Sequence, residues 1–470
     1  MLVLPALVAT ALVGSAFASP ISAPAVIATP DSGPATADPA AIHYNPAAIG
    51  ATNGVDIMVD LQLSAIDVYY DATRNNGVDP NTGEAYKLAE AHVIVPVGLV
   101  GVTWKPHKML ALGFAATDSY VGGGDYSGTE TPGENYQGAQ RYAGIKTQLI
   151  TLSLMPAVAI TPIEGVHVGG TFAYVYDKIS LLKASDPLGT EGYDFIGQVP
   201  YANDVVLSLE GSGGHTSWSV GVFVDRWKFL QVGASFSDAG AFSTAGDAKV
   251  TVPDFLAEGD GDVVVPANFT FDMPLPQVFR AGAASQINDK LKVGAAVEYR
   301  MWNDCCGSPS GDAVIGLVSE DGDGLGKADG LSIEVNDTIY SPRRLWNNLD
   351  ITANGGYWIT EALWVGAKGG YKQYAVPDFA VNATNLDFEV VGMTAAVRYR
   401  FAKKYTVGLA YTKNFLTPRT ITNSAWDVRD ENDPDYVDDR FTTQAPYNTG
   451  SNGTYTGDSN VFGLRLQADL

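Results

Sequence analysis

The chain has 470 residues, of which 46% are hydrophobic and only 17% are charged, and its formal net charge is −23. So acidic a composition excludes a nucleic-acid binder, because phosphates call for a basic surface. Beyond the first 18 residues, no segment approaches the roughly 18 to 20 unbroken apolar residues of a membrane-spanning helix. Length alone allows two or three domains, but large barrels also reach this size as one unit.

The N-terminus divides into two segments that differ in composition. Residues 1–18 are apolar and end in Ala16-Phe17-Ala18, the small-x-small pattern that closes a secretory signal peptide. The usual positive n-region is missing, so either the start codon is placed too late or the signal is atypical. Residues 19–53 are rich in Pro and Ala, and Pro is excluded from central strands because it lacks a ladder donor. This second segment is therefore either a flexible leader or a segment folded inside a β-barrel formed by the rest of the chain.

From residue 55 onward, apolar residues recur at every second position, which predicts β-strands. Very short connections follow every even-numbered strand, and long acidic loops follow every odd-numbered one. This alternation is typical of an outer-membrane β-barrel, whose turns face the periplasm and whose loops face outward. The 51 Gly and 23 Tyr suit such a barrel, where Gly lets strands bend and Tyr lines the interfaces. The expected strands are 55–71, 89–104, 109–120, 144–161, 165–181, 203–225, 229–239, 277–287, 291–302, 347–359, 363–374, 387–401, 405–416 and 459–470.

The strand expected at 203–225 decides the count. Gly211, Gly213 and Gly214 could split it in two, which would give fifteen strands. Bacterial single-chain barrels have an even number, because both ends then stay on the periplasmic side. Parity therefore favours fourteen, with the glycines marking a bulge or an extension above the membrane.

Two strands show the alternating faces clearly. In 291–302 the residues Val293, Val297 and Tyr299 are expected to face lipid, and Glu298 and Arg300 the lumen. The strand 387–401 repeats the pattern, and charge on the lipid face at mid-membrane would cost about 2 to 4 kcal/mol. A soluble β-sandwich also alternates and remains an alternative. The same alternation predicts that five cationic side chains face the lumen, where they could bind a ligand carboxylate or form ordinary salt bridges. They are Arg280, Arg300, Lys372, Arg398 and Arg400.

No constellation of catalytic or metal-binding residues emerges. The five histidines are scattered, and no GxSxG, HExxH or Walker sequence is present, so we expect no enzyme, no metal site and no cofactor. Cys305 and Cys306 are adjacent and predict either a vicinal disulfide or two free thiols. The acidic loops, with Asp321 and Asp323 as examples, predict a solvated rim or divalent-cation bridges to lipid headgroups.

Several stretches together resemble the FadL family of outer-membrane transporters. Asn45-Pro46-Ala47 matches a triplet in the family's N-terminal hatch, although it also fits a plain helix start with Pro at the first position. Four further segments match in family order: 154–162 with 168–170, 271–284 with 297–302, 345–350 with 355–357, and 369–371 with 376–378. The chain departs from the family pattern at its end, where Leu470 replaces the usual terminal aromatic residue.

The resemblance implies an all-β, 14-stranded antiparallel transmembrane β-barrel with a short N-terminal hatch inside the lumen. Its parts would be a signal peptide (1–18), the hatch (19–53, with Asn45, Pro46 and Ala47) and the barrel (54–470). The location would be the outer membrane of a Gram-negative cell, in contact with outer-membrane lipid, and we expect a monomer. A sideways exit through a kinked third strand is also implied, and Pro96, Gly113 and Pro156 are the candidates, unless each Pro merely marks a strand end or bulge.

The expected function is passive uptake of long-chain fatty acids or other hydrophobic small molecules. Outer loops would capture the substrate, the hatch would gate its passage, and the barrel wall would release it. The alternatives are a general porin-like channel or surface adhesin, in which residues 19–53 would be a free leader, and a barrel hydrolase. Which hydrophobic compound is carried stays open at this stage.

Overall fold

The computed structural model describes residues 21–22, 30–71, 88–126, 139–185, 204–227, 229–254, 262–307, 311, 313–320, 325–328, 331–334, 337–341, 343–424 and 451–470. Within these residues no helix is long and apolar enough to cross a membrane. The expected signal peptide and the acidic residues Asp321 and Asp323 lie outside them.

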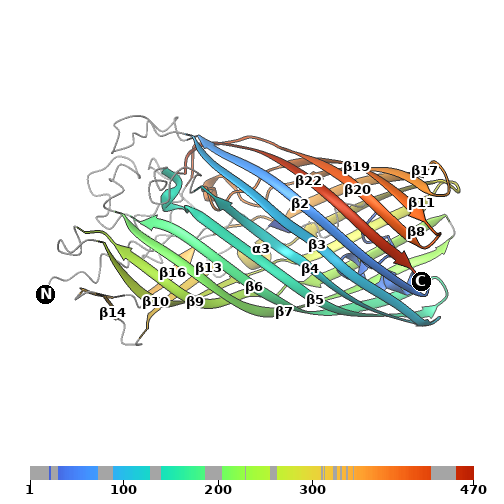
Figure 1. Cartoon of the computed structure of the whole chain (residues 1–470), viewed down its shortest axis with the longest axis horizontal. Helices are drawn as coiled ribbons and strands as arrows, with labels where there is room; N and C mark the ends of the chain where they lie inside the picture. The colour runs from blue at the N-terminus through green and yellow to red at the C-terminus, as the bar shows by residue number, and fades with distance from the viewer. Residues whose placement is uncertain are drawn as a thin grey trace.

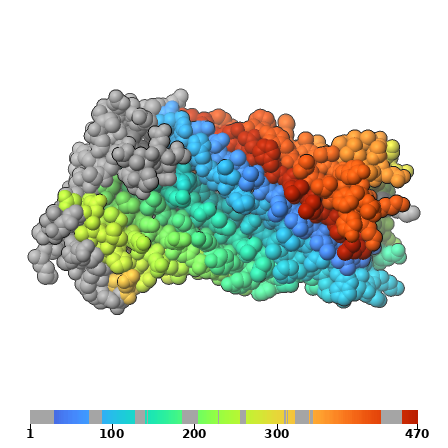
Figure 2. All heavy atoms as spheres, viewed as in Figure 1, coloured from blue at the N-terminus to red at the C-terminus, as the bar shows by residue number. Residues whose placement is uncertain are grey.

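Fourteen of the described strands form one closed antiparallel barrel, as predicted (Figure 1). Neighbours in sequence pair around the wall, and β2 pairs with β22 to close it, with Asp56 opposite Asp469. Figure 2 shows this closure on the surface, where the blue first strand lies beside the red last one. The barrel strands are β2 (Val55–Asp71), β3 (Ala89–His107), β4 (Leu110–Asp125), β5 (Lys146–Ile163), β6 (Val166–Ser185), β7 (Val205–Trp227), β8 (Leu230–Asp238), β11 (Gln277–Gln286), β12 (Leu291–Arg300), β17 (Asn348–Trp358), β18 (Leu363–Lys372), β19 (Val390–Phe401), β20 (Tyr405–Leu416) and β22 (Gly453–Asp469).

The alternation of faces follows the sequence pattern. Met393, Val397 and Tyr399 of β19 are exposed on the outside, whereas Thr394 between them is buried inside. The outward side chains form an apolar surface of the kind that meets lipid, because hydrocarbon carries no penalty for exposed Leu, Phe or Tyr. Phe172 and Phe462, each more than half exposed, extend this surface to β6 and β22.

Two of the expected long loops, 240–276 and 303–346, contain strands and so correct the prediction. β9 (Ala241–Val252), β10 (Val263–Pro274), β13 (Ala313–Ser319) and β16 (Asp337–Ser341) continue the sheet beyond the membrane. The long strand β7 belongs both to the barrel wall and to this outer sheet. It pairs with β8 from Trp218 onward and with β9 over Val206–Gly213. The glycine-rich part of β7 is thus an extension, and a buried apolar cluster fills the space behind it.

Shorter elements complete the outer end. They are the hairpin β14 (Leu325–Ala328) and β15 (Leu331–Glu334), the strand β21 (Arg419–Ile421), the helix α3 (Trp302–Cys306), and the 3₁₀ helices η3 (Ala139–Tyr142) and η6 (Asp378–Ala380). Of the two states expected for the adjacent cysteines, the structure has the disulfide, between Cys305 and Cys306 in α3.

Residues 30–53, called the hatch below, fold inside the half of the barrel that carries the short turns. They form a turn, the short helix α2 (Ala41–Tyr44) and the 3₁₀ helix η1 (Pro46–Ala51). Ala41, Ile42, Ala47, Ala48 and Ile49 are fully buried against wall residues of β4, β5, β6 and β7. The proline-rich segment therefore fills the lumen.

Candidate functional site: a lumen cavity

A cavity of about 400 Å³ lies in the lumen above the hatch. That volume falls within the range of sites for small organic ligands. Ser32–Pro34 and Ile42–Tyr44 of the hatch form its floor, and residues 383, 384 and 386–388 of the loop between β18 and β19 line its outer side. The wall between them has a face rich in hydroxyl groups and a face rich in charge.

Asn45 organises the hatch locally. Its side-chain oxygen accepts a hydrogen bond from the Ala47 N–H at 3.2 Å and caps η1, which has Pro46 at its start. Its side-chain nitrogen donates to the carbonyls of Pro34 at 2.9 Å and of Val222 at 3.1 Å. Asn45 is 0% exposed, so it joins the two halves of the hatch to the wall strand β7.

The wall makes room for the hatch by having glycine where the hatch lies closest. A β-carbon at Gly169 of β6 would lie 2.7 Å from the Pro46 carbonyl oxygen, and one at Gly233 of β8 would lie 1.9 Å from the Pro34 oxygen. Neither distance is possible for a real β-carbon. The backbone of the hatch therefore rests directly on the backbone of the wall.

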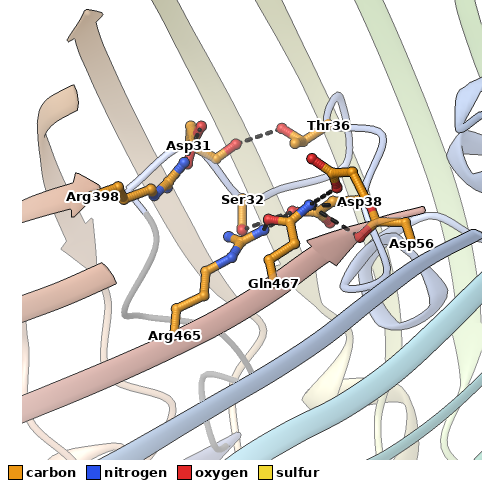
Figure 3. A network of polar contacts seen from close by, with 9 residues as sticks. Asp31, Ser32, Thr36, Asp38, Asp56, Arg398, Arg465 and Gln467 are labelled. Carbon is orange, nitrogen blue, oxygen red and sulfur yellow. Dashed lines mark hydrogen bonds and ion pairs between the residues drawn. The ribbon is translucent and has the colours of Figure 1, made fainter. Parts of the chain in front are cut away.

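Two buried ion pairs anchor the floor to the opposite side of the barrel (Figure 3). Asp31 accepts hydrogen bonds from the Arg398 guanidinium, one of them at 3.1 Å, and Asp38 accepts one from Arg465 at 3.2 Å. Burial raises the pKa of Asp31, but the positive charge of Arg398 outweighs it and holds that pKa well below its ordinary value. Asp31 is therefore ionised while the hatch is docked.

The charged face of the cavity is built from paired side chains. Glu298 of β12 accepts from Arg280 at 2.7 Å and lies 2.5 Å from the Arg300 guanidinium, which also reaches Asp350 at 3.3 Å. Lys372 lies 3.7 Å from Asp387. Three of the five cations expected in the lumen thus line the cavity, each beside a carboxylate.

The other two expected cations lie elsewhere. Arg398 anchors the hatch through Asp31, and its guanidinium also stacks over Trp364, 4.0 Å from the ring centre. Arg400 stacks over Trp358 at 4.5 Å. Neither lines the cavity.

Lys368 of β18 lines the cavity and was missed from the sequence. In the part of the chain that the structure describes, no carboxylate lies within ion-pairing distance of its ammonium, in contrast to Arg280, Arg300 and Lys372. Lys368 shares the inward phase of Lys372, four residues later, so the period of two could have identified it.

The opposite face offers hydroxyl groups. Ser119 of β4 and Ser153 of β5 share a hydrogen bond of 2.5 Å, and Thr171 of β6 and Ser219 of β7 share one of 2.6 Å. All four residues line the cavity, and Ser237 of β8, which accepts from Arg280 at 3.2 Å, joins this face to the charged one. The cavity is therefore encircled by polar groups between apolar surfaces.

The barrel wall is incompletely paired beside the cavity. Pairing between β3 and β4 begins at Leu99 opposite Thr117 and continues toward the periplasm. Above that level, the described residues of these two strands form no pair with each other. The Gly98 N–H instead donates to the Asp118 carboxylate at 3.0 Å, and β4 bulges between Asp118 and Val121. Both unpaired segments line the cavity.

A short strand lies on the free edge of β4 at this level. β1 (Ile21–Ser22) pairs there, with Ile21 opposite Val121 and Ser22 opposite Tyr120. On its other edge β4 pairs with β5, with Val121 opposite Ile150. The two-residue strand thus takes the position on β4 that β3 occupies lower down.

A family model described as "Outer membrane protein transport protein (OMPP1/FadL/TodX)" matches residues 6–468. The chain belongs to this family. Among solved structures, the fold resembles a FadL homologue of Pseudomonas aeruginosa, with 15% identity, a TM-score of 0.68 and 98% of this chain and 99% of that one covered. It also resembles the toluene transporters TbuX of Ralstonia pickettii (14% identity, TM-score 0.62, 95% and 98% covered) and TodX of Pseudomonas putida (15%, 0.60, 97% and 98%). No curated protein sequence matches the chain.

Membership of the FadL/TodX family establishes the general role. The chain is an outer-membrane β-barrel that transports hydrophobic compounds, and the family consists of transport channels rather than enzymes. The similarity to individual solved structures is below 25% identity and supports the fold alone.

The three residues expected at the exit of this FadL-family barrel occupy different positions. Pro96 lies in the part of β3 that has no β4 partner. Pro156 lies opposite Phe114 of β4, and the pairing of β5 with β6 is interrupted between Leu154 and Ala157. Gly113 lies lower, in fully paired wall, where an added β-carbon would come within 2.8 Å of the Ile42 side chain. Gly113 thus contacts the hatch.

Proposed function

We propose that this FadL-family protein takes up long-chain fatty acids. The observation that carries the proposal is Lys368, a cation inside the cavity that lacks a carboxylate partner among the described residues. A fatty acid supplies that partner at one end and an apolar chain at the other. A neutral aromatic hydrocarbon supplies only apolar surface.

Energetics supports the same choice. A hydrogen bond to a charged group in a largely desolvated site is worth about 1.5 to 3 kcal/mol. We therefore expect Lys368→Met to weaken fatty-acid binding about ten- to hundredfold. The matched control is Lys404→Met, which removes an exposed lysine in a periplasmic turn and should leave affinity unchanged.

The first experiment is mass spectrometry of lipids retained by gently purified protein. Fatty acid in the wild type and its loss in Lys368→Met would support the proposal. Retention of neutral hydrocarbon in both proteins would refute it in favour of a hydrocarbon carrier. High single-channel conductance of the intact protein would instead favour the porin-like alternative.

We further propose that the hatch gates the passage. Asn45 supports this role because one side chain caps η1 and holds both Pro34 and the wall. Asn45→Ala removes the cap and leaves two buried carbonyls without their donor, a loss of about 1 to 3 kcal/mol. Bound fatty acid should be lost in this variant, and unchanged retention would weaken the proposed role.

We also propose that the cargo leaves sideways between β3 and β4. The unpaired segments above Leu99 support this route, since no ladder of backbone hydrogen bonds has to break there. β1 lies on the β4 edge at the same level, so release requires β1 to leave Val121. The bound substrate would then pass directly from the cavity into the lipid.

A further inference from the structure

The loop between β18 and β19 folds into the mouth of the barrel instead of extending away from it. In this roof loop, defined as residues 373–389, every residue from Ala380 to Phe388 is buried. Ala383, Thr384, Leu386, Asp387 and Phe388 line the cavity directly. The roof loop and the hatch therefore enclose the cavity from opposite ends.

One side chain outside the loop holds both of its ends. Arg419 of β21 donates to the Val376 carbonyl at 2.9 Å and to the Asp387 carbonyl at 2.8 Å. It also binds the Asp378 carboxylate at 2.5 Å and lies over the Tyr374 ring, 4.3 Å from its centre. Arg419 itself is buried, with 7% of its surface exposed.

The tip of the roof loop is also hydrogen-bonded to the barrel, and Val381 and Leu386 beside it pack in an apolar cluster with Tyr70. Tyr126 donates to the Ala383 carbonyl at 3.0 Å, Thr384 donates to the Ala143 carbonyl at 3.2 Å, and Ser424 donates to the Val381 carbonyl at 2.8 Å. These are single hydrogen bonds between neutral groups, each worth about 1 kcal/mol. The charged contacts of Arg419 are the stronger set.

The sequence of the loop suits a segment that meets water as well as a packed interior. Asn382, Thr384, Asn385 and Asp387 are all buried in it, although such residues are usually exposed. Within the tip, Asn382 accepts from the Thr384 and Asn385 backbone N–H groups at 2.9 and 2.7 Å and keeps the turn folded by itself. These two hydrogen bonds lie within the loop and do not depend on the barrel.

We propose that the roof loop is the outer gate of the cavity and that Arg419 is the positioning residue that holds it shut. Release of Arg419 removes its contacts at both ends of the loop, while the Trp346 N–H bond to the Ala375 carbonyl and the Lys372–Asp387 pair remain, and connects the cavity to the outside. The hatch closes the cavity at its other end, and the unpaired β3–β4 edge lies at its side. The gate rests on the proposed function only for the identity of the cargo, because its position can be measured without any ligand.

The test places a reporter at the tip. Ala383→Cys is buried under the closed loop, while Cys305 and Cys306 are joined to each other. The rate of reaction with a bulky, membrane-impermeant maleimide added outside intact cells then reports how often the tip is exposed. Wild-type protein, with no additional cysteine, gives the background.

The variants distinguish loss of the Arg419 contacts from general destabilisation of the protein. In the Ala383→Cys protein, Arg419→Ala should speed labelling about tenfold or more, because it removes one ionic and two carbonyl contacts. Arg419→Lys keeps the positive charge but lacks the several N–H donors of the guanidinium. Its labelling rate should fall between those of the Ala383→Cys parent and the Arg419→Ala variant. Lys413→Ala is the matched control, since its ion pair with Asp458 on β20 and β22 does not involve the roof loop.

Each outcome decides the question. Faster labelling in Arg419→Ala, with the control unchanged and the barrel intact by heat-modified gel migration, supports the gate. Labelling as slow as in the Ala383→Cys parent overturns it, whatever ligand the protein carries. If Arg419→Ala does not fold, Asp378→Asn carries the test, because Asp378 is exposed and only its carboxylate is lost. Faster labelling of Asp378→Asn supports the role of Arg419 in holding the loop shut, and unchanged labelling overturns it.

Discussion

Asn45 of the hatch approaches Gly221 of β7 so closely that a β-carbon on Gly221 would lie 2.1 Å from the Asn45 side-chain oxygen. The Asn45 nitrogen meanwhile donates to the carbonyl of the next wall residue, Val222. The hatch is thus fitted to the wall at a position where only glycine leaves enough room. This contact links one wall residue to the state of the plug.

Gly221→Ala should therefore dislodge the hatch. The added methyl group occupies the position of the Asn45 oxygen, and the cap of η1 and the two carbonyl contacts cannot all persist. We expect higher single-channel conductance in planar bilayers than in the wild type. Gly369→Ala is the control, because a β-carbon there meets nothing within 4 Å. A closed channel in Gly221→Ala would show that this contact does not hold the plug.

Acid should weaken hatch docking through His43. Burial, followed by the Arg280 charge, lowers the pKa of His43 to about 3 from an ordinary value of 6.5. Between pH 7.5 and 5.5 an undocked hatch gains a proton that the docked hatch does not, so docking loses stability as pH falls. The loss is about 1 kcal/mol at pH 5.5.

The measurement is bilayer conductance at the two pH values. We expect the wild type to open more often at pH 5.5, and His43→Gln, which does not titrate, to lose that difference. Arg300 and Glu298 also face His43. Equal pH dependence in both proteins would assign it to another group.

The membrane part of the fold was predictable because each strand has to present apolar side chains to lipid at every second position, which is visible in the local sequence. Alternation with a period of two and the parity of the connections gave fourteen strands, including β7 as one strand. The same signal misled in 241–252 and 263–274, where strands of the outer sheet were expected to be loop. β9 pairs with β7 and β10 pairs with β13, both distant in sequence, and such pairing cannot be identified from neighbouring residues.

The site was predictable only in part. The inward and outward alternation of side chains along each strand placed Arg280, Arg300 and Lys372 in the lumen. Which cation lacks a carboxylate partner depends on the register between β12, β17 and β18, which alternation does not give. The Asn45 cap was readable from Asn before Pro, whereas its contact with Gly221 spans 176 positions of sequence. The roof loop contacts Arg419, which lies outside the loop itself.

Joining β3 to β4 above Leu99 should block release without blocking binding. Val97 and Val121 pack in one buried cluster across the unpaired edge. We expect a short thiol cross-link in Val97→Cys/Val121→Cys to stop transfer of fatty acid from the cavity into vesicle lipid. Reduction or omission of the cross-linker should restore it.

The matched control uses strands that are already paired. Leu99 and Thr117 lie opposite each other just below the edge, so the same cross-link in Leu99→Cys/Thr117→Cys adds no new barrier. Transfer should continue in this variant. Unimpaired transfer through a cross-linked 97–121 pair would mean that the cargo leaves by another route.

Glu298→Gln should make the cavity a stronger anion binder and a less stable structure. Arg280 and Arg300 both lose their shared carboxylate, and Arg300 keeps only Asp350. Removing one member of such a buried set destabilises by about 3 kcal/mol. Thermal unfolding measures that loss, and affinity for a fatty acid relative to its methyl ester measures the freed charge. Glu164→Gln, in an exposed periplasmic turn, should change neither. A fatty acid bound no more tightly than before would mean that Glu298 does not compete with the cargo for these guanidinium groups.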